Sequence, residues 1–251
     1  MRVAVIGGTG LIGTKLVARL RGEGHEVVVA SRATGVNSYT GEGLADALEG
    51  VATVIDTSNS GYFDDRAALD FFYASTLNLL TYGAAAGVQH HVALSVVGTD
   101  RLAASEGGYF KAKDAQEKLI RESGKPYTIV HGTQFFEFVK SIADAATVGH
   151  IVRLSRAFIQ PIAGDDVAAF VAATAVGAPA NTVVEVAGPE RFRLEELVRT
   201  SLKVRDDPRQ VVADPLARYF GTELAEGELL PAPGATLATT RFADWLEASP
   251  R

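Results

Sequence analysis

The sequence predicts an α/β fold, a doubly wound parallel sheet with a small C-terminal substrate-side subdomain. Two observations predict it. A short β-branched strand at residues 2–6 runs into the glycine-rich turn 7–13, from which a periodic helix starts. Strand and helix patterns then alternate to about residue 135, which is typical of a parallel sheet with helices on both faces. We expect residues 1–150 to form the main domain and residues 151–251 a smaller part packed on the same fold.

The turn after the first strand carries two overlapping glycine spacings, Gly8-x-Gly10-x-x-Gly13 and Gly7-x-x-Gly10-x-x-Gly13. Glycines at these positions let a pyrophosphate approach the N-terminus of the next helix without interference from Cβ atoms. A second strand at residues 27–30 completes the βαβ context that such a turn requires. The turn therefore predicts a Rossmann-type dinucleotide site, with cofactor contacts from Gly7, Thr9, Gly10, Leu11, Ile12 and Gly13.

The remaining elements follow from hydrophobic period and from the residues that begin and end helices. Helices are expected at residues 44–48, 67–86, 111–122, 139–146, 167–176 and 194–202, and around Phe242, Trp245 and Leu246. Strands are expected at residues 51–56, 91–97, 127–130, 151–154 and 183–186. Asp64-Asp65 supplies N-cap chemistry for the long helix, which Gly87 closes, and Asp165-Asp166 is expected to cap the helix at 167–176.

Composition limits the classes of protein that remain. The net charge is −6, and basic residues are spread along the chain, which argues against nucleic acid as the main partner. There are no cysteines, so disulfides, thiolate catalysis and cysteine-ligated metals are excluded. No apolar run reaches membrane-spanning length and no signal-peptide pattern precedes the first strand. We therefore expect a cytoplasmic protein without a membrane partner.

The end of the second strand predicts which dinucleotide is bound. In NAD sites an acidic residue about 20 residues after the turn accepts hydrogen bonds from the adenosine ribose. Here the strand ends in Ser31-Arg32, with no carboxylate. A carboxylate would repel a 2′-phosphate, whereas an arginine can grip it with two charge-assisted hydrogen bonds. Ser31 and Arg32 therefore predict NADP(H) in preference to NAD(H).

Tyr109 and Lys113 stand four residues apart on the helix that follows the strand at 91–97, so they share a helix face. A neighbouring ammonium favours the phenolate and lowers the pKa of a tyrosine, which fits it for proton transfer. Ser95 lies at the carboxyl end of the preceding strand, where parallel sheets bind ligands. Its hydroxyl can hydrogen-bond a substrate carbonyl. Ser95, Tyr109 and Lys113 are the predicted catalytic residues.

Three segments carry a resemblance to a known family: IGGTGLIG at 6–13, STLNLLTYGAAAGVQHHVALS at 75–95 and YFKAKDAQEKLIRESGKPYTIV at 109–130. In these segments the chain resembles the short-chain dehydrogenase/reductase superfamily. It looks closest to the atypical, NmrA-like, NAD(P)-binding branch, which grades into epimerase-like members. Looser similarity at 159–168 and 184–197 extends the resemblance over most of the chain.

The resemblance implies roles for particular residues. Ser95, Tyr109 and Lys113 match the family's serine, tyrosine and lysine, and Lys113 would also hydrogen-bond the nicotinamide ribose. Residues 131–135 would lie along the nicotinamide. Further cofactor contacts are expected from Thr57, Ser58, Gly132 and Thr133, and substrate contacts from Tyr62, Gln134, Phe135 and Phe136. The alternative for Phe135, Phe136 and Phe138 is a place in the ordinary core.

The chain also departs from the family's pattern. It has His131-Gly132 where relatives often have Arg-Pro, and Gly41-Glu42-Gly43 where many have an aspartate near the adenine. In the NmrA-like branch the tyrosine is often absent, and some members bind the cofactor without turning it over. The presence of both Tyr109 and Lys113 favours chemistry in this chain.

The histidines offer no set of metal ligands, so no metal site is expected. His90 and His91 begin a buried strand at the end remote from the ligand, which favours a structural role. His131 follows a strand on the cofactor side, where a structural and a functional role are equally compatible with its position.

The leading functional hypothesis is an NADPH-dependent oxidoreductase that reduces a carbonyl, a quinone or an activated double bond of a small apolar substrate. The first alternative is a non-catalytic NADP(H)-binding regulator or redox sensor that acts through a protein partner. The second is an epimerase or isomerase that uses the same site and recycles the cofactor.

Overall fold

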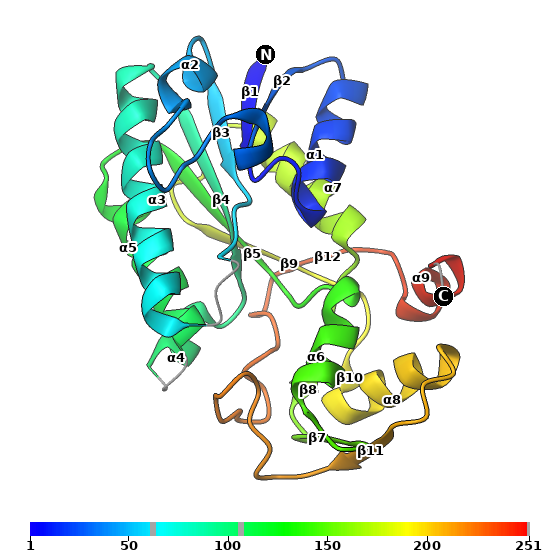
Figure 1. Ribbon diagram of the computed structural model, residues 1–251. Helices are drawn as coiled ribbons and strands as arrows, with labels where there is room; N and C mark the ends of the chain where they lie inside the picture. The colour runs from blue at the N-terminus through cyan, green and yellow to red at the C-terminus, as the bar shows by residue number, and fades with distance from the viewer. Residues whose placement is uncertain (61–63, 105–107, 250–251) are drawn as a thin grey trace. The chain divides into compact units, whose positions relative to one another are not determined.

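The computed structural model describes residues 1–60, 64–104 and 108–249, and its largest sheet has seven strands (Figure 1). The strand order is β12-β9-β5-β4-β3-β1-β2, in which β2, β1, β3 and β4 pair in parallel, as do β9 and β12. The strands are β1 (Arg2–Ile6), β2 (Glu26–Ala30), β3 (Thr53–Asp56), β4 (His90–Val96), β5 (Tyr127–Gly132), β9 (Val183–Ala187) and β12 (Thr236–Leu237). The predicted Rossmann-type parallel sheet is confirmed.

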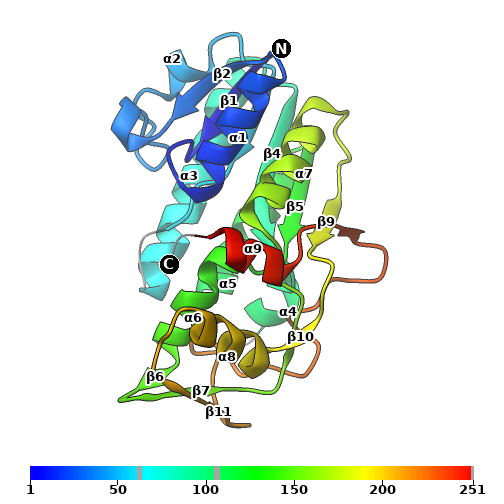
Figure 2. The ribbon, with the colours of Figure 1, turned by 90° about the vertical axis from the view of Figure 1, so that its right-hand side faces the viewer.

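Helices cover both faces of the part of the sheet formed by β1 to β5. α1 and α7 lie on one face, and α3 and α5 lie on the other (Figure 1, Figure 2). The Thr53 hydroxyl in β3 donates to the Ala175 carbonyl of α7 over 3.2 Å. The described helices are α1 (Leu11–Gly22), α2 (Leu44–Leu48), α3 (Asp65–Ala85), α4 (Thr99–Ala103), α5 (Gly108–Glu122), α6 (Val139–Ala145), α7 (Gly164–Val176), α8 (Leu194–Val204) and α9 (Phe242–Ala248), with 3-10 turns η1 (Arg32–Thr34) and η2 (Phe136–Phe138).

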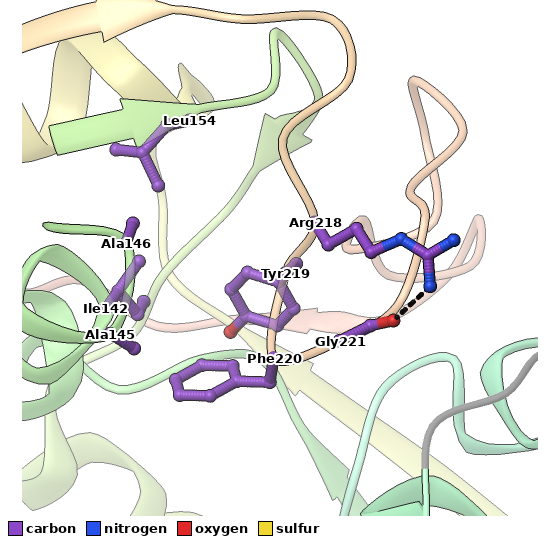
Figure 3. A pocket seen from close by; sticks show the side chains of 8 residues that line it. All are labelled: Ile142, Ala145, Ala146, Leu154, Arg218, Tyr219, Phe220 and Gly221. Carbon is purple, nitrogen blue, oxygen red and sulfur yellow. Dashed lines mark hydrogen bonds between the residues drawn. The ribbon is translucent and has the colours of Figure 1, made fainter. Parts of the chain in front are cut away.

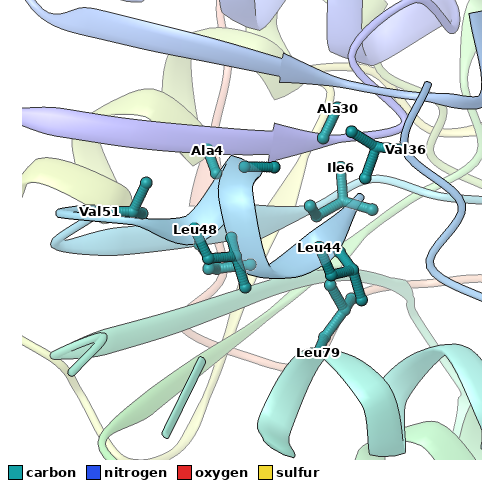
Figure 4. Close-up of a cluster of buried hydrophobic side chains, with 10 residues drawn as sticks. Ala4, Ile6, Ala30, Val36, Leu44, Leu48, Val51 and Leu79 are labelled. Carbon is teal, nitrogen blue, oxygen red and sulfur yellow. The ribbon is translucent and has the colours of Figure 1, made fainter. Parts of the chain in front are cut away.

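A hydrophobic cluster fills the space between β1 and helices α2 and α3. Ala4 and Ile6 point to this side of β1, and Leu44, Leu48 and Leu79 meet them from the helices (Figure 4). Residues two apart on a strand share a face, so the intervening side chains of β1 face the other layer of helices. Because β1 is buried on both faces, its sequence is an almost continuous apolar run. This run made the position of β1 predictable.

The N-termini of α3 and α7 can be compared with the N-caps predicted for them. The Asp64 carboxylate accepts a hydrogen bond from Ala67 N–H over 2.8 Å, so the predicted N-cap of α3 is confirmed. The prediction for Asp165-Asp166 is wrong, because α7 begins at Gly164 and both aspartates lie inside its first turn. The Gly164 N–H instead donates to the carboxylate of Glu137, at 3.1–3.2 Å. The N-terminus of α7 is thus capped by a carboxylate 27 residues earlier in the sequence, and such a partner cannot be predicted from residue spacing.

The chain forms two compact units that interleave along the sequence. Unit 1 comprises Met1–Ser95, Gly108–His131 and Val167–Val184, and unit 2 comprises Val96–Gly107, Gly132–Asp166 and Glu185–Arg251. This division differs from a boundary near residue 150. The physical reason is that α7, though late in the sequence, packs against the first strands, as the Thr53–Ala175 hydrogen bond shows.

Unit 2 contains two small sheets, with strand orders β10-β8 and β11-β7-β6. Their strands are β6 (Thr147–Val148), β7 (Ile151–Leu154), β8 (Phe158–Ile159), β10 (Phe192–Arg193) and β11 (Gln210–Ala213).

A hollow of about 260 Å³ lies between α6, β7 and the segment 218–221, and Tyr219 and Phe220 form one wall (Figure 3). None of the described residues that were predicted to bind cofactor or substrate lines it. Among the described helices, none has the length and apolar character needed to cross a membrane.

Candidate functional site

The glycine-rich turn after β1 depends on glycine at two positions for different reasons. Gly7 has φ +74°, and a Cβ there would lie 3.0 Å from the backbone of Ser58. A Cβ on Gly13 would overlap the carbonyl oxygen of Gly7. The first turn of α1 therefore packs directly against the loop that precedes it, and the loop in turn lies against the end of β3.

The tip of this turn is open to solvent. Thr9, Gly10 and Leu11 are exposed, whereas Ile12 and Gly13 are buried. Gly10 occupies the N-cap of α1, and no side chain within the described ranges caps the helix. The backbone N–H groups of a helix's first turn have no partner within the helix and carry the positive end of its dipole. The predicted pyrophosphate contacts therefore have the backbone chemistry that an anion requires.

The end of β2 lies beside the turn, because Gly7 N–H and Gly8 N–H both donate to the Ala30 carbonyl, at 2.9 and 3.3 Å. Ser31 and Arg32 follow directly and open η1. The Arg32 side chain is exposed and makes no hydrogen bond or ion pair within the part of the chain that the structure describes. Its guanidinium is available to a ligand phosphate.

The end of β3 holds a buried carboxylate. Asp56 is 1% exposed, and its Oδ1 accepts hydrogen bonds from the N–H and hydroxyl of Ser58, at 2.9 and 2.6 Å. The Thr57 hydroxyl donates to the Ile6 carbonyl over 2.8 Å, which ties this loop to the end of β1. Thr57 and Ser58, both predicted cofactor contacts, therefore belong to the loop against which Gly7 packs.

Tyr109 lies in the first turn of α5, with 38% of its surface exposed. Its hydroxyl donates to Asn59 Oδ1 over 3.2 Å, and its ring meets Phe72 edge to face at 6.0 Å between centroids. Desolvation of the hydroxyl raises the pKa of Tyr109 to about 12. This shift is opposite to the lowering expected from Lys113, because desolvation of the hydroxyl determines the direction of the change in pKa.

Lys113 is buried one turn farther along α5, at 2% exposure. Its Nζ donates to the Leu94 carbonyl over 2.9 Å and to Gln116 Oε1, and it lies 4.6 Å from the centre of the Phe72 ring. Burial lowers the pKa of Lys113 to about 8, although the charges of Asp56 and Glu117 oppose this shift. The contact with Leu94 places the ammonium at the residue before Ser95.

Ser95, Glu117 and His131 form a second buried group. Ser95 Oγ and His131 Nε2 both contact Glu117 Oε1, at 2.5 and 2.9 Å, and Arg121 reaches Oε2 at 2.5 Å. Although burial favours the protonated form, hydrogen bonds from His131 and Ser95 and the charge of Arg121 hold the pKa of Glu117 below its ordinary value. His131 thus has a structural partner, and the hydroxyl proton of Ser95 is directed to Glu117.

The residues that follow β5 lie in unit 2. Thr133 and Gln134 are buried, at 1% and 7% exposure. The Thr133 hydroxyl and both amide atoms of Gln134 find no hydrogen-bond partner among the described residues. Buried polar groups are rarely left unpaired, so these side chains have the capacity to bind a polar ligand or water.

Phe135 and Phe136 have different surroundings. Phe135 stacks on Phe138, with ring centres 5.3 Å apart. Phe136 is 2% exposed and packs against Phe242 and Trp245, with ring centres 5.1 and 5.4 Å away. The structure therefore places Phe136 in an aromatic core rather than on an open wall. Tyr62, also predicted to contact substrate, lies outside the described residues.

His90 and His91 are buried at the start of β4, as the structural interpretation predicted. His90 Nε2 lies 2.9 Å from the hydroxyl of Thr128, and burial lowers the pKa of both histidines. In the described ranges, no group of three or more acidic or histidine side chains is arranged to hold a metal ion.

Sequence reasoning missed four residues of this site, namely Asp56, Asn59, Gln116 and Glu117. A signal was present for two of them, because Gln116 and Glu117 lie three and four residues after Lys113 and so share its helix face. Asp56 ends a predicted strand at the ligand-binding edge of the sheet, which was a weaker signal.

A family model described as NAD(P)H-binding matches residues 7–176, more than half of the chain. One curated relative, the photosystem II assembly factor Ycf39 of Synechocystis sp., is 30% identical over 156 residues, which cover 55% of this chain and 46% of that protein. The chain thus spans about half the length of the curated relatives it matches.

Two solved structures illustrate the likeness of fold. A short-chain dehydrogenase/reductase superfamily protein from Agrobacterium tumefaciens with bound NAD has a TM-score of 0.70 at 15% identity, over 99% of this chain and 95% of that one. The NADPH-dependent quinone oxidoreductase QOR2 of Escherichia coli, complexed with NADPH, has a TM-score of 0.61 at 21% identity, over 86% and 78%. At these identities the likeness shows the shared fold.

Proposed function

This chain belongs to the NAD(P)H-binding family, and on that premise we propose that it is an oxidoreductase that uses NADP(H) to reduce a carbonyl, a quinone or an activated double bond of a small apolar substrate. The observation that carries the proposal is a continuous set of contacts in unit 1. Gly7 lies against Ser58, which bonds Asp56, and Gln116 joins Asp56 to Lys113. The cofactor turn and the catalytic lysine therefore belong to one polar site.

The glycine-rich turn fits a dinucleotide, because its tip is open and side chains at Gly7 and Gly13 would collide with backbone. We assign the pyrophosphate to residues 7–13, with Thr57 and Ser58 contributing from the neighbouring loop. The guanidinium of Arg32, exposed beside the end of β2 and unpaired among the described residues, supports NADP(H) over NAD(H). When bound, the dinucleotide supplies the hydride.

Tyr109 is assigned the proton transfer to the substrate oxygen. A pKa of about 12 keeps its hydroxyl protonated through the neutral range, so it can act as the acid in the reductive direction. Lys113 remains mostly charged at pH 7 and stabilises negative charge that develops on the phenolic oxygen when Tyr109 moves toward it. Ser95 is assigned to the substrate oxygen, which requires its hydroxyl to turn away from Glu117.

In unit 2 we assign Gln134 and Phe135 to substrate recognition, and Gly132 and Thr133 to the cofactor. The amide of Gln134, which has no partner in the described part of the chain, supports this assignment, since it can both donate and accept a hydrogen bond. Phe135, the next residue after Gln134, stacks on Phe138, and this aromatic pair offers apolar surface to an apolar substrate.

A single substitution tests the proposed function. Tyr109→Phe is expected to reduce NADPH oxidation by about 100-fold or more, because it removes the proposed acid, while NADPH affinity stays within about twofold. Turnover is measured by NADPH absorbance with a panel of quinones, aldehydes and ketones, and affinity by calorimetry. Turnover by the Phe variant equal to that of the wild-type protein would exclude Tyr109 as the acid.

A non-catalytic NADP(H)-binding regulator with a protein partner is the second candidate. Two observations favour it: Ser95 is bonded to Glu117 and Tyr109 to Asn59, and the relative Ycf39 is described as an assembly factor. Under this alternative the protein binds NADPH but consumes none with any member of the panel. Epimerase or isomerase chemistry on the same site would instead convert substrate with no net change in the cofactor.

A further inference from the structure

A buried chain of hydrogen bonds in unit 1 connects the end of β3 to the end of β4 through two residues of α5. Ser58 donates to Asp56 Oδ1, Gln116 Nε2 donates to Asp56 Oδ2 over 2.9 Å, and Lys113 Nζ donates to Gln116 Oε1. Lys113 then reaches the Leu94 carbonyl. Asp56, Gln116 and Lys113 are each at most 2% exposed.

These hydrogen bonds can run in only one direction, from the Lys113 ammonium through the Gln116 amide to the Asp56 carboxylate. An ionised carboxylate accepts hydrogen bonds and donates none, so Asp56 takes the NH₂ group of Gln116. The amide oxygen of Gln116 must then face Lys113, whose ammonium donates and does not accept. The charge of Asp56 therefore determines the orientation of the amide and, through it, the position of the ammonium.

The amide also keeps the two charges apart. A direct ion pair would bring the carboxylate onto the ammonium, whereas the bridge through Gln116 uses a single N–H of Lys113. A second N–H goes to Leu94, and the described residues offer no further hydrogen-bond acceptor to this ammonium. One N–H of Lys113 is thus left for a ligand oxygen, next to the ring of Phe72.

We propose that Asp56 and Gln116 are positioning residues, which hold the Lys113 ammonium so that its remaining N–H binds a ribose hydroxyl in the nicotinamide half of the dinucleotide. The identity of this ligand rests on the proposed function. The role of Asp56 and Gln116 rests on the hydrogen bonds themselves and requires no assumption about turnover.

The test uses three variants and two reference variants of the full chain. Gln116→Met keeps the length of the side chain and removes the bridge, and Asp56→Asn removes the charge that orients it. In the double variant D56N/Q116E the Asn amide can donate to the Glu carboxylate, which can accept from Lys113. The series of hydrogen bonds is thus restored, with the negative charge moved from position 56 to position 116. Lys113→Met gives the effect of losing the ammonium, and the exposed Lys111→Met serves as the control.

Calorimetry measures the affinity for whichever of NADPH and NADH the wild-type protein binds more tightly. The control ligand is the adenosine half alone, 2′,5′-ADP for NADPH or ADP for NADH. Thermal unfolding confirms that each variant is folded.

Gln116→Met and Asp56→Asn are each expected to weaken dinucleotide binding about tenfold, as expected for losing one charge-assisted hydrogen bond, and to leave the control ligand within about twofold. The double variant should recover most of the loss, and Lys111→Met should show none. Folded Gln116→Met that binds the dinucleotide like wild type overturns the inference, as does an equal loss for both ligands. If Asp56→Asn does not fold, Gln116→Met decides alone. Wild-type protein that binds neither dinucleotide contradicts the proposed function instead.

Discussion

The hydroxyl of Ser95 and the carboxylate of Glu117 share a hydrogen bond of 2.5 Å, with both side chains buried. The same carboxylate also bonds His131 and Arg121. One acidic side chain of α5 therefore contacts residues of β4, β5 and its own helix. Ser95 was expected from the sequence to face substrate. In the structure its direction is determined by Glu117.

Glu117→Gln is expected to lower the free energy of unfolding by about 2–3 kcal/mol at pH 7, because His131 and Arg121 lose a buried charged partner. The pKa of Glu117 is lowered in the folded protein, so its contribution is present above the unfolded value of about 4.3 and is lost as the pH falls through the folded value. Urea unfolding of both proteins from pH 7 to pH 3 measures this.

The difference between wild type and Glu117→Gln should therefore shrink at acidic pH. The control is Glu122→Gln, since Glu122 is exposed and pairs with Lys118 at 3.9 Å, and its effect should stay within about 0.5 kcal/mol. A constant difference across the pH range would mean that the ionised form of Glu117 contributes nothing to folding.

Gly13→Ala is expected to destabilise the protein by about 1–3 kcal/mol and to weaken dinucleotide binding, since the new Cβ would overlap the Gly7 carbonyl oxygen. Gly22→Ala is the matched control on the same helix. No atom of the residues that the structure describes lies within 4 Å of its Cβ position, so alanine should be tolerated there. Chemical unfolding measures both, and equal stability of the two variants would contradict the packing argument.

Arg32→Ala is expected to weaken NADPH binding by about tenfold to 100-fold and to leave NADH binding nearly unchanged, because only NADPH carries the 2′-phosphate. Arg66→Ala, at another exposed arginine, controls for the loss of a surface charge. Calorimetric titration with both dinucleotides gives the ratio of affinities. An unchanged ratio would remove Arg32 as the residue that selects the cofactor.

The local elements were predictable because each depends on neighbours in the sequence. The run at β1, the turn after it, the Asp64 cap and the Gly87 stop all specify their own conformation within a few residues. The resemblance rested on such segments. The NAD(P)H-binding family is confirmed, and a short-chain dehydrogenase/reductase superfamily protein shares the fold. The cap of α7 was mispredicted because its partner, Glu137, lies 27 residues away.

The sequence by itself determined the parallel α/β sheet, the glycine-rich turn and the helix face that carries Tyr109 and Lys113, since period and spacing specify them. Only the tertiary structure decided which groups these side chains bond. Lys113 meets Gln116 and Leu94, Tyr109 meets Asn59, and Ser95 meets Glu117. Those partners come together because folding brings the ends of β3, β4 and β5 against α5, and no spacing along the chain encodes which donor finds which acceptor.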